Sequence, residues 1–132
     1  MSSVMSIAAS GMAAAERRLE VSARNVANVS TTGPLDAAPD DVRAAYAALR
    51  ADQTQTAGGG TAVNVSRASP ATIAVSDPAS PFANADGLVA APAVDLANEA
   101  VQQLVARYSF AANAAVMRAG DKMTKSLLDM TA

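Results

Sequence analysis

The feature that most constrains the fold of this chain is a regular spacing of small and apolar residues from Met1 to Val29. The spacing alternates between four and three, which is the period of a helix that packs along one seam. It predicts a helix that ends between Asn28 and Gly33, where polar side chains can bind free backbone groups, Gly33 can adopt a positive φ and Pro34 stops the helix. The seam positions are Met1, Met5, Ala8, Met12, Ala15, Leu19, Ser22, Val26 and Val29.

A second helix is predicted after Pro92 and runs almost to the C-terminus. Asp95 is a suitable N-cap, and Glu99 places negative charge in the first turns, where the helix dipole favours it. Apolar residues recur here with a period of about 3.67 residues per turn, which favours a straight or slightly right-handed helix. The seam positions are Val101, Val105, Tyr108, Ala112, Val116, Ala119, Met123, Leu127 and Met130.

Composition favours close helix packing over a globular core. Hydrophobic residues make up 51% of the chain, but it has only two Phe, two Tyr and no Trp. Aromatic side chains each bury roughly 150 to 250 Å², so an interior without them has little volume. A seam rich in Ala and Met buries too little apolar area to hold two long helices by itself, and neighbouring subunits are the obvious source of further burial.

The residues between the two helices have a different composition. Asp36 to Asp41 could cap a short helix over Arg43–Arg50, and Gly58 to Gly60 predict a flexible connector. Thr61–Ser66 and Thr72–Ser76 each alternate apolar and polar residues and predict a β-hairpin with a turn at Arg67–Pro70. Its buried side would carry Val63, Val65, Ile73 and Val75. Turn or extended segments follow at Asp77–Pro81 and Asn84–Gly87.

The predicted fold class is therefore mainly α. Long N- and C-terminal helices pair as a coiled-coil-like hairpin around a small irregular and β-hairpin middle region. The predicted organisation is an axial helix with an Asn-rich end at residues 1–33, a middle region at 34–92 and a second axial helix at 93–132.

The chain lacks the usual side chains of an active site. It contains no His and no Cys, which removes the commonest general base and the commonest metal ligands. The formal net charge is −2, and Lys and Arg are dispersed, unlike the basic patches that bind nucleic acid. We predict no enzymatic activity, cofactor, metal site, nucleic-acid partner or small-molecule substrate.

The N-terminal segment does not have the pattern of a cleaved secretory signal. A signal peptide carries positive charge before its apolar stretch, whereas here the first charges, Glu16, Arg17 and Arg18, come after it. No apolar run approaches the length of about 18 residues that spans a bilayer. If the protein leaves the cytoplasm, we expect it to do so by another route.

Both ends of the chain resemble the signatures of flagellar axial proteins, the family of rod and hook proteins. The N-terminal resemblance rests on Ala9-Ser10-Gly11-Met12, Arg18-Leu19, Asn25-Val26-Ala27-Asn28 and Thr31-Thr32-Gly33. The C-terminal resemblance rests on Arg107-Tyr108-Ser109-Phe110-Ala111-Ala112-Asn113, Val116, Met123 and Leu127-Leu128. The short middle is similar to that of the proximal rod proteins of type C, as is the run from Asp77-Pro78 through Asn84-Ala85-Asp86-Gly87-Leu88-Val89 to Pro92. Pro34 departs from the family pattern, in which an aromatic residue often follows the Gly.

The resemblance implies a structural subunit of the proximal rod in the flagellar basal body. Such a subunit is exported through the flagellar type III apparatus without a cleaved signal, spans the periplasm and self-assembles through its terminal helices. It transmits torque and surrounds the export channel. The implied partners are copies of itself, other rod proteins, the basal-body ring and the export apparatus. Alternatives are a different type III secreted filament or translocator subunit, and a membrane-surface or regulatory coiled coil.

The seam and the family signatures together predict an assembly interface. Small residues are expected where backbones approach closely, and large apolar residues where seams are buried. The predicted interface residues are Met5, Ala8, Gly11, Met12, Ala15, Leu19, Asn25, Val26, Asn28, Val101, Val105, Tyr108, Ala112, Asn113, Val116, Met123 and Leu127.

Overall fold

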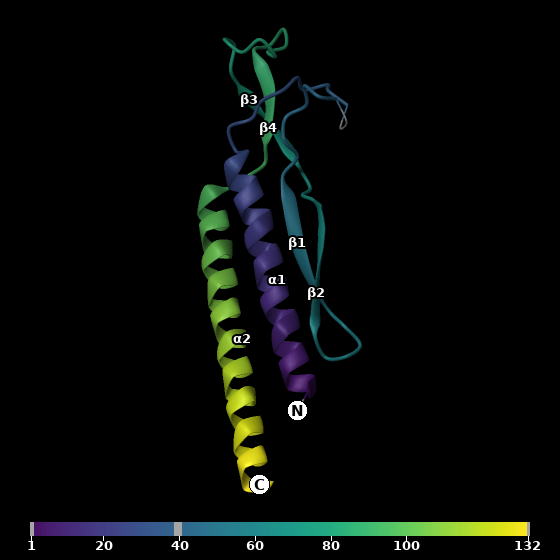
Figure 1. Cartoon of the computed structure of the whole chain (residues 1–132). Coiled ribbons are helices and arrows are strands. Elements are labelled where there is room, and N and C mark those ends of the chain that lie inside the picture. The colour runs from purple at the N-terminus through teal and green to yellow at the C-terminus, as the bar shows by residue number, and fades with distance from the viewer. Residues whose placement is uncertain (1, 39–40, 132) are drawn as a thin grey trace. The chain divides into compact units, whose positions relative to one another are not determined.

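Along the chain, one long helix comes first, four short strands follow, and a second long helix comes last (Figure 1). The computed structural model describes residues 2–38 and 41–131, so Met1 of the predicted seam and Pro39 and Asp40 of the predicted cap lie outside the described residues. The elements are α1 (Ser2–Ala27), β1 (Leu49–Gln55), β2 (Thr61–Arg67), β3 (Thr72–Ser76), β4 (Leu88–Pro92) and α2 (Leu96–Thr131). The predicted fold class is confirmed.

The helix ends follow local capping rules. At the end of α1 the Asn28 side chain donates a hydrogen bond to the Arg24 carbonyl at 2.8 Å, and Thr31 Oγ1 donates to the Asn28 carbonyl at 2.9 Å. At the start of α2 the Asp95 carboxylate accepts hydrogen bonds from the backbone N–H groups of Ala97, at 2.9 Å, and Asn98. Both predicted helix boundaries are therefore set by short polar side chains next to the apolar pattern.

Gly33 has a different role from the one predicted. The described residues with positive φ are Gly59 and Gly87, not Gly33. A Cβ on Gly33 would lie 2.5 Å from the Ala45 backbone nitrogen. Close approach of another backbone segment, rather than a left-handed conformation, is what requires glycine there.

The chain divides into two compact units, and the first comprises Met1–Glu20, Ala51–Asn64 and Val101–Ala132. In this unit α1 and α2 run antiparallel, with Arg18 donating to Gln102 at 2.8 Å and Gly120 lying next to Met5. The β1–β2 turn closes through a Thr56 N–H to Gly60 carbonyl bond of 2.9 Å. The three glycines thus form a hairpin turn, which packs on α1.

The second unit comprises Val21–Arg50 and Val65–Ala100. Here β3 pairs antiparallel with β4, and Gly33 bridges the other edge of β4 at Ala90. Its core is small: Val89 is fully buried, and Val21, Ala48 and Ala90 are buried as well.

The predicted short helix over Arg43–Arg50 is wrong, because the segment is a turn followed by the start of β1. Its backbone N–H groups are bound by distant partners. Tyr46 N–H donates to Thr31 Oγ1 at 3.1 Å, and Ala48 N–H donates to the Ala71 carbonyl at 3.0 Å. These tertiary hydrogen bonds override the helix propensity of an Ala-rich segment.

The two predicted strands exist, but their predicted pairing is wrong. Thr61–Arg67 pairs with Leu49–Gln55, and Thr72–Ser76 pairs with Leu88–Pro92. Burial also differs from the prediction, since Val63 and Val65 are half-buried while Ile73 and Val75 are exposed. The alternating pattern identified two strands, but it could not reveal the partner of β3, because Leu88–Pro92 does not alternate apolar and polar residues.

Candidate assembly surface

The large apolar residues of the predicted α2 seam lie on the surface of the chain. We call the nine seam positions of α2 the outer stripe. They are Val101, Val105, Tyr108, Ala112, Val116, Ala119, Met123, Leu127 and Met130. Their larger side chains range in exposure from 40% for Val105 to 80% for Met130, and Tyr108 is 75% exposed. Exposed apolar side chains arranged along a whole helix are typical of an interaction surface.

A different face of α2 packs within the chain. Ala106 is 1% exposed and Gly120 is buried. A Cβ added to Gly11 of α1 would lie 2.5 Å from Asn113 Oδ1, so the α2 backbone approaches α1 closely through small and polar groups. The half-buried residues of this inner face are Gln103, Ser109, Asn113, Ala114, Met117 and Thr124.

The α1 seam, in contrast, turns mostly inward. Ala8 and Ala15 are 1% and 3% exposed, and Ser22 is buried. Met5, Met12 and Val26 of the seam are half-buried, as is Gly11 beside it, and Leu19 is 38% exposed. Within the first unit, Ala8 and Ala15 are therefore already buried by the chain itself.

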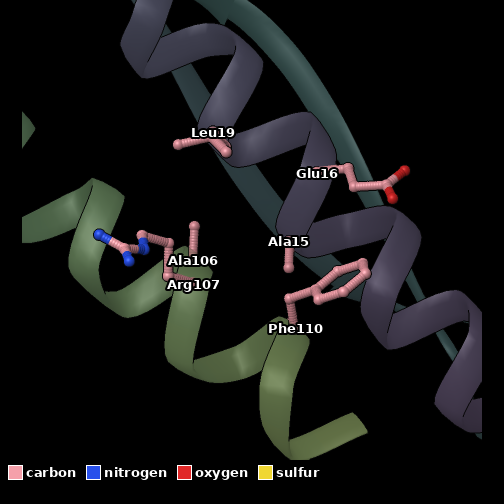
Figure 2. Close-up of a pocket in the computed structure, with 6 residues that line it drawn as sticks. All are labelled: Ala15, Glu16, Leu19, Ala106, Arg107 and Phe110. Atoms are coloured by element: carbon pink, nitrogen blue, oxygen red, sulfur yellow. The ribbon is translucent and has the colours of Figure 1, made fainter. Parts of the chain in front are cut away.

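A hollow of about 380 Å³ opens between α1 and α2 in the first unit. Figure 2 shows Leu19 of α1 and Phe110 of α2 pointing into the space between the helices, with Ala15 and Ala106 beside them. Glu16 and Arg107 also line it. A second hollow, of about 420 Å³, is lined by Leu104, Arg107, Tyr108 and Ala111 of α2. Both hollows could receive an apolar side chain next to a charge.

In the second unit, Asn25 is the centre of a buried hydrogen-bond cluster. Its amide nitrogen donates to the Leu49 carbonyl at 2.8 Å and to Glu99 Oε1 at 2.6 Å. Its oxygen accepts from Leu49 N–H at 2.9 Å and from the Tyr46 hydroxyl at 3.2 Å. Nearby, Ser22 Oγ donates to the Glu99 carbonyl at 3.3 Å. Asn25 is 2% exposed, and its amide mimics a peptide group that joins α1, β1 and α2.

The surroundings of Tyr46 in this cluster also shift its pKa. Burial raises the pKa of Tyr46, the Glu99 charge raises it further, and the Arg24 charge opposes both. At neutral pH the Tyr46 hydroxyl is therefore protonated and can donate to Asn25.

The predicted interface residues differ in how far the chain itself buries them. Ala8, Ala15 and Asn25 are buried within the chain, whereas Met5, Gly11, Met12, Val26, Asn28 and Asn113 are half-buried. The exposed ones are Leu19, Val101, Val105, Tyr108, Ala112, Val116, Met123 and Leu127. Sequence reasoning missed the inner role of Ala106 and the Tyr46 and Glu99 partners of Asn25. The available signal for Ala106 was the spacing of seven residues between Ala106, Asn113 and Gly120. No signal pointed to Tyr46.

Comparison with known proteins identifies the family. Residues 5–34 match the family model described as flagella basal body rod protein. The flagellar basal-body rod protein FlgC of Salmonella typhimurium is 33% identical over 96% of this chain and 95% of the relative. FlgC of Yersinia enterocolitica is 34% identical over 95% of this chain and 90% of the relative. The chain belongs to the flagellar basal-body rod protein family.

Family membership confirms the predicted resemblance and the predicted structural, non-enzymatic role in the flagellar basal body. The similarity to FlgC extends across the middle region, where the proximal rod proteins of type C were the expected match. Among the described residues, neither α1 nor α2 is apolar enough over a sufficient length to cross a bilayer.

Proposed function

We propose that this rod protein assembles with copies of itself and with other rod proteins through the outer stripe of α2. In the assembled rod it transmits torque, surrounds the channel for export and meets the basal-body ring and the export apparatus. It would reach the periplasm through the flagellar export apparatus without a cleaved signal. The carrying observation is the exposed apolar surface from Val101 to Met130.

The arrangement of the two helix faces supports a role between subunits. The inner face of α2 uses Ala106, Asn113 and Gly120 against α1, which leaves the bulky residues for other chains. A helix that binds neighbours through a surface not used within its own chain can form a heterologous contact, which repeats to give an open helical assembly.

Two hollows lined by residues of α2 add a requirement of shape and charge to the proposed contact. Leu19 and Phe110 line one hollow and Leu104 and Tyr108 line the other, while Arg107 lines both. A neighbouring helix that places an apolar side chain in either hollow and a carboxylate near Arg107 would satisfy both features.

Complementation of a deletion strain tests the proposal. Val116→Asp puts a charge on the outer stripe and should abolish swimming and rod formation, seen by motility assay and electron microscopy of basal bodies. Leu19→Asp, at the rim of the first hollow, should do the same. The reason is that burying an unpaired carboxylate in an apolar contact is strongly unfavourable.

Two controls separate assembly from general charge effects. Arg118→Asp is exposed on α2, two residues from Val116 but outside the outer stripe, and it changes the net charge more. It should support swimming, as should Arg43→Ala in the loop before β1. Normal motility in Val116→Asp, with the variant protein in the basal body, would refute the role of the outer stripe.

A further inference from the structure

The two strands of the β3–β4 hairpin differ sharply in burial. In β4, Val89, Ala90 and Pro92 are buried. Every residue of β3 is exposed, including Ile73 at 47% and Val75 at 40%. The sequence pattern places Ile73 and Val75 on one face, so β3 carries an apolar face that the chain itself does not cover.

The register shows which backbone groups of β3 are unpaired. Gly33 and Ala90 exchange two hydrogen bonds, of 3.1 and 2.8 Å, so the N–H and C=O groups of Ala90 point away from β3. Ala74 pairs opposite Ala90 and therefore occupies a non-hydrogen-bonded position of the antiparallel ladder. The N–H and C=O groups of Ala74, and by alternation those of Thr72 and Ser76, point to the outer edge. No further strand of the described chain pairs with that edge.

The outer edge has none of the side-chain features that usually block strand pairing. Natural edge strands are protected by charges, prolines or bulges, whereas Thr72–Ser76 contains no charged residue and no Pro. Its sequence is also symmetric in chemistry. A hydroxyl residue stands at each end, a β-branched apolar residue stands next to each, and Ala74 is in the centre.

We propose that β3 is a self-complementary pairing edge, which binds the β3 strand of a second copy antiparallel about a twofold axis at Ala74. In this register Ala74 of one copy lies opposite Ala74 of the other, and Thr72 lies opposite Ser76. Both pairs occupy hydrogen-bonded positions of the ladder. Ile73 meets Val75 across the closer, non-hydrogen-bonded positions, where β-branched pairs stabilise a sheet. Asp77, the nearest charge, falls opposite Ala71 of the partner, so no like charges meet.

This pairing is separate from assembly through α2. A twofold contact uses the same surface on both subunits and closes on itself, so it cannot extend a rod. The β3 pair is therefore a dimeric state of the free subunit. It covers a strand of high β propensity that would otherwise be an aggregation-prone edge.

Sedimentation of the full-length chain tests the pairing. The wild-type chain should pass from monomer to dimer as its concentration rises to about 1 mM, the range of weak complexes. Ala74→Lys places two like charges at the twofold axis and should remain monomeric. Ala62→Lys makes the same change at an exposed alanine of β2 and should dimerise like the wild type. A wild-type chain that stays monomeric, or an Ala74→Lys variant that dimerises equally, overturns the proposal.

A disulfide experiment locates the contact, because the chain has no cysteine of its own. Cα atoms in a hydrogen-bonded antiparallel pair are about 5.5 Å apart, within the usual span of a disulfide. Ala74→Cys should therefore form an intermolecular disulfide at least about tenfold faster than Ala62→Cys under mild oxidation. Equal rates contradict the twofold register. A dimer that Tyr108→Asp removes and Ala74→Lys leaves intact would place the contact on the outer stripe of α2 and would also overturn the proposal.

Discussion

The two terminal helices have similar apolar periods but use them in opposite ways. In α1 the seam contains Ala8 and Ala15, which are buried against the rest of the chain. In α2 the corresponding seam is the outer stripe, with Tyr108 75% exposed. A helical period shows that one face is apolar, but it does not show whether the covering partner belongs to the same chain.

Residue size accounts for the difference. Close contact between two helices needs small side chains, and α2 provides them on its inner face at Ala106 and Gly120, while α1 provides Gly11. Large side chains on the inner face would hold the axes apart and break the Arg18–Gln102 hydrogen bond. The bulky apolar residues of α2 therefore lie on the outside of the chain, where the proposed assembly would cover them.

The largest effect should come from placing the same charge on the two faces of α2. Ala106→Asp buries a carboxylate against α1 and should lower the free energy of unfolding by about 4 kcal/mol. Tyr108→Asp, two residues away on the outer stripe, should change it by less than about 0.5 kcal/mol. Urea denaturation of both variants measures the difference. Equal losses would show that the outer stripe packs within the chain, as the α1 seam does, and would contradict the difference between the two helices.

The next largest effect is expected at Asn25, which joins both helices to β1. Asn25→Asp replaces the donor that serves the Leu49 carbonyl and Glu99 by an acceptor, so we expect a loss of about 3 kcal/mol. Asn64→Asp makes the same change at an exposed position of β2 and should be nearly neutral.

The pH dependence of Asn25→Asp gives a second readout. Burial and the Glu99 charge should raise the pKa of the new carboxyl above its value in the unfolded chain, so the folded state binds the proton more tightly. The stability deficit relative to wild type should therefore shrink as the pH falls from about 8 to about 5. A deficit independent of pH would mean that the new carboxyl is not held beside Glu99.

A smaller loss is expected at Gly11. A Cβ there would overlap the Asn113 amide, and this overlap outweighs the gain in helix propensity, so Gly11→Ala should cost about 1 kcal/mol net. Adding Asn113→Ala removes the overlapping atoms, and the double variant should recover part of the loss in a double-mutant cycle. Strict additivity of the two changes would show that the residues are not in contact.

The parts of the fold that depend on local chemistry could be predicted from the sequence. Both helices, the Asp95 cap and the end of α1 just before Asn28 follow from periodicity and from short polar side chains near in sequence. The pairing of the middle strands depends on distant hydrogen bonds, such as the one between Ala48 and Ala71. No local pattern encodes such bonds, and β4 lacks alternation because its residues are buried on both faces.

In the candidate assembly surface, too, local features could be predicted and distant contacts could not. The residues of the outer stripe were identified by their spacing, yet the sequence did not show that they lie on the outside of the chain. Asn25 was identified through the family signature as an interface residue, whereas the structure places it in a buried cluster with Tyr46 and Glu99. Asn25 lies 21 residues from Tyr46 and 74 residues from Glu99 in the sequence, so spacing alone cannot match these groups.

The smallest effect, and one of opposite sign, is expected at Gly120. A Cβ there would lie 3.7 Å from Met5 Cγ and 3.8 Å from Met5 Cε, which is ordinary van der Waals contact. Gly120→Ala should therefore gain helix propensity without overlap and raise the free energy of unfolding by about 0.5 to 1 kcal/mol. The effect of a Gly→Ala substitution on stability thus has opposite signs at Gly11 and Gly120, because of these two only Gly11 faces a polar side chain at overlap distance.

A loss at Gly120 in urea denaturation would mean that α1 and α2 approach more closely near Met5 than these distances allow. An unchanged value would mean that this turn of α2 is not helical in the free subunit, and the inner face would then end before Gly120.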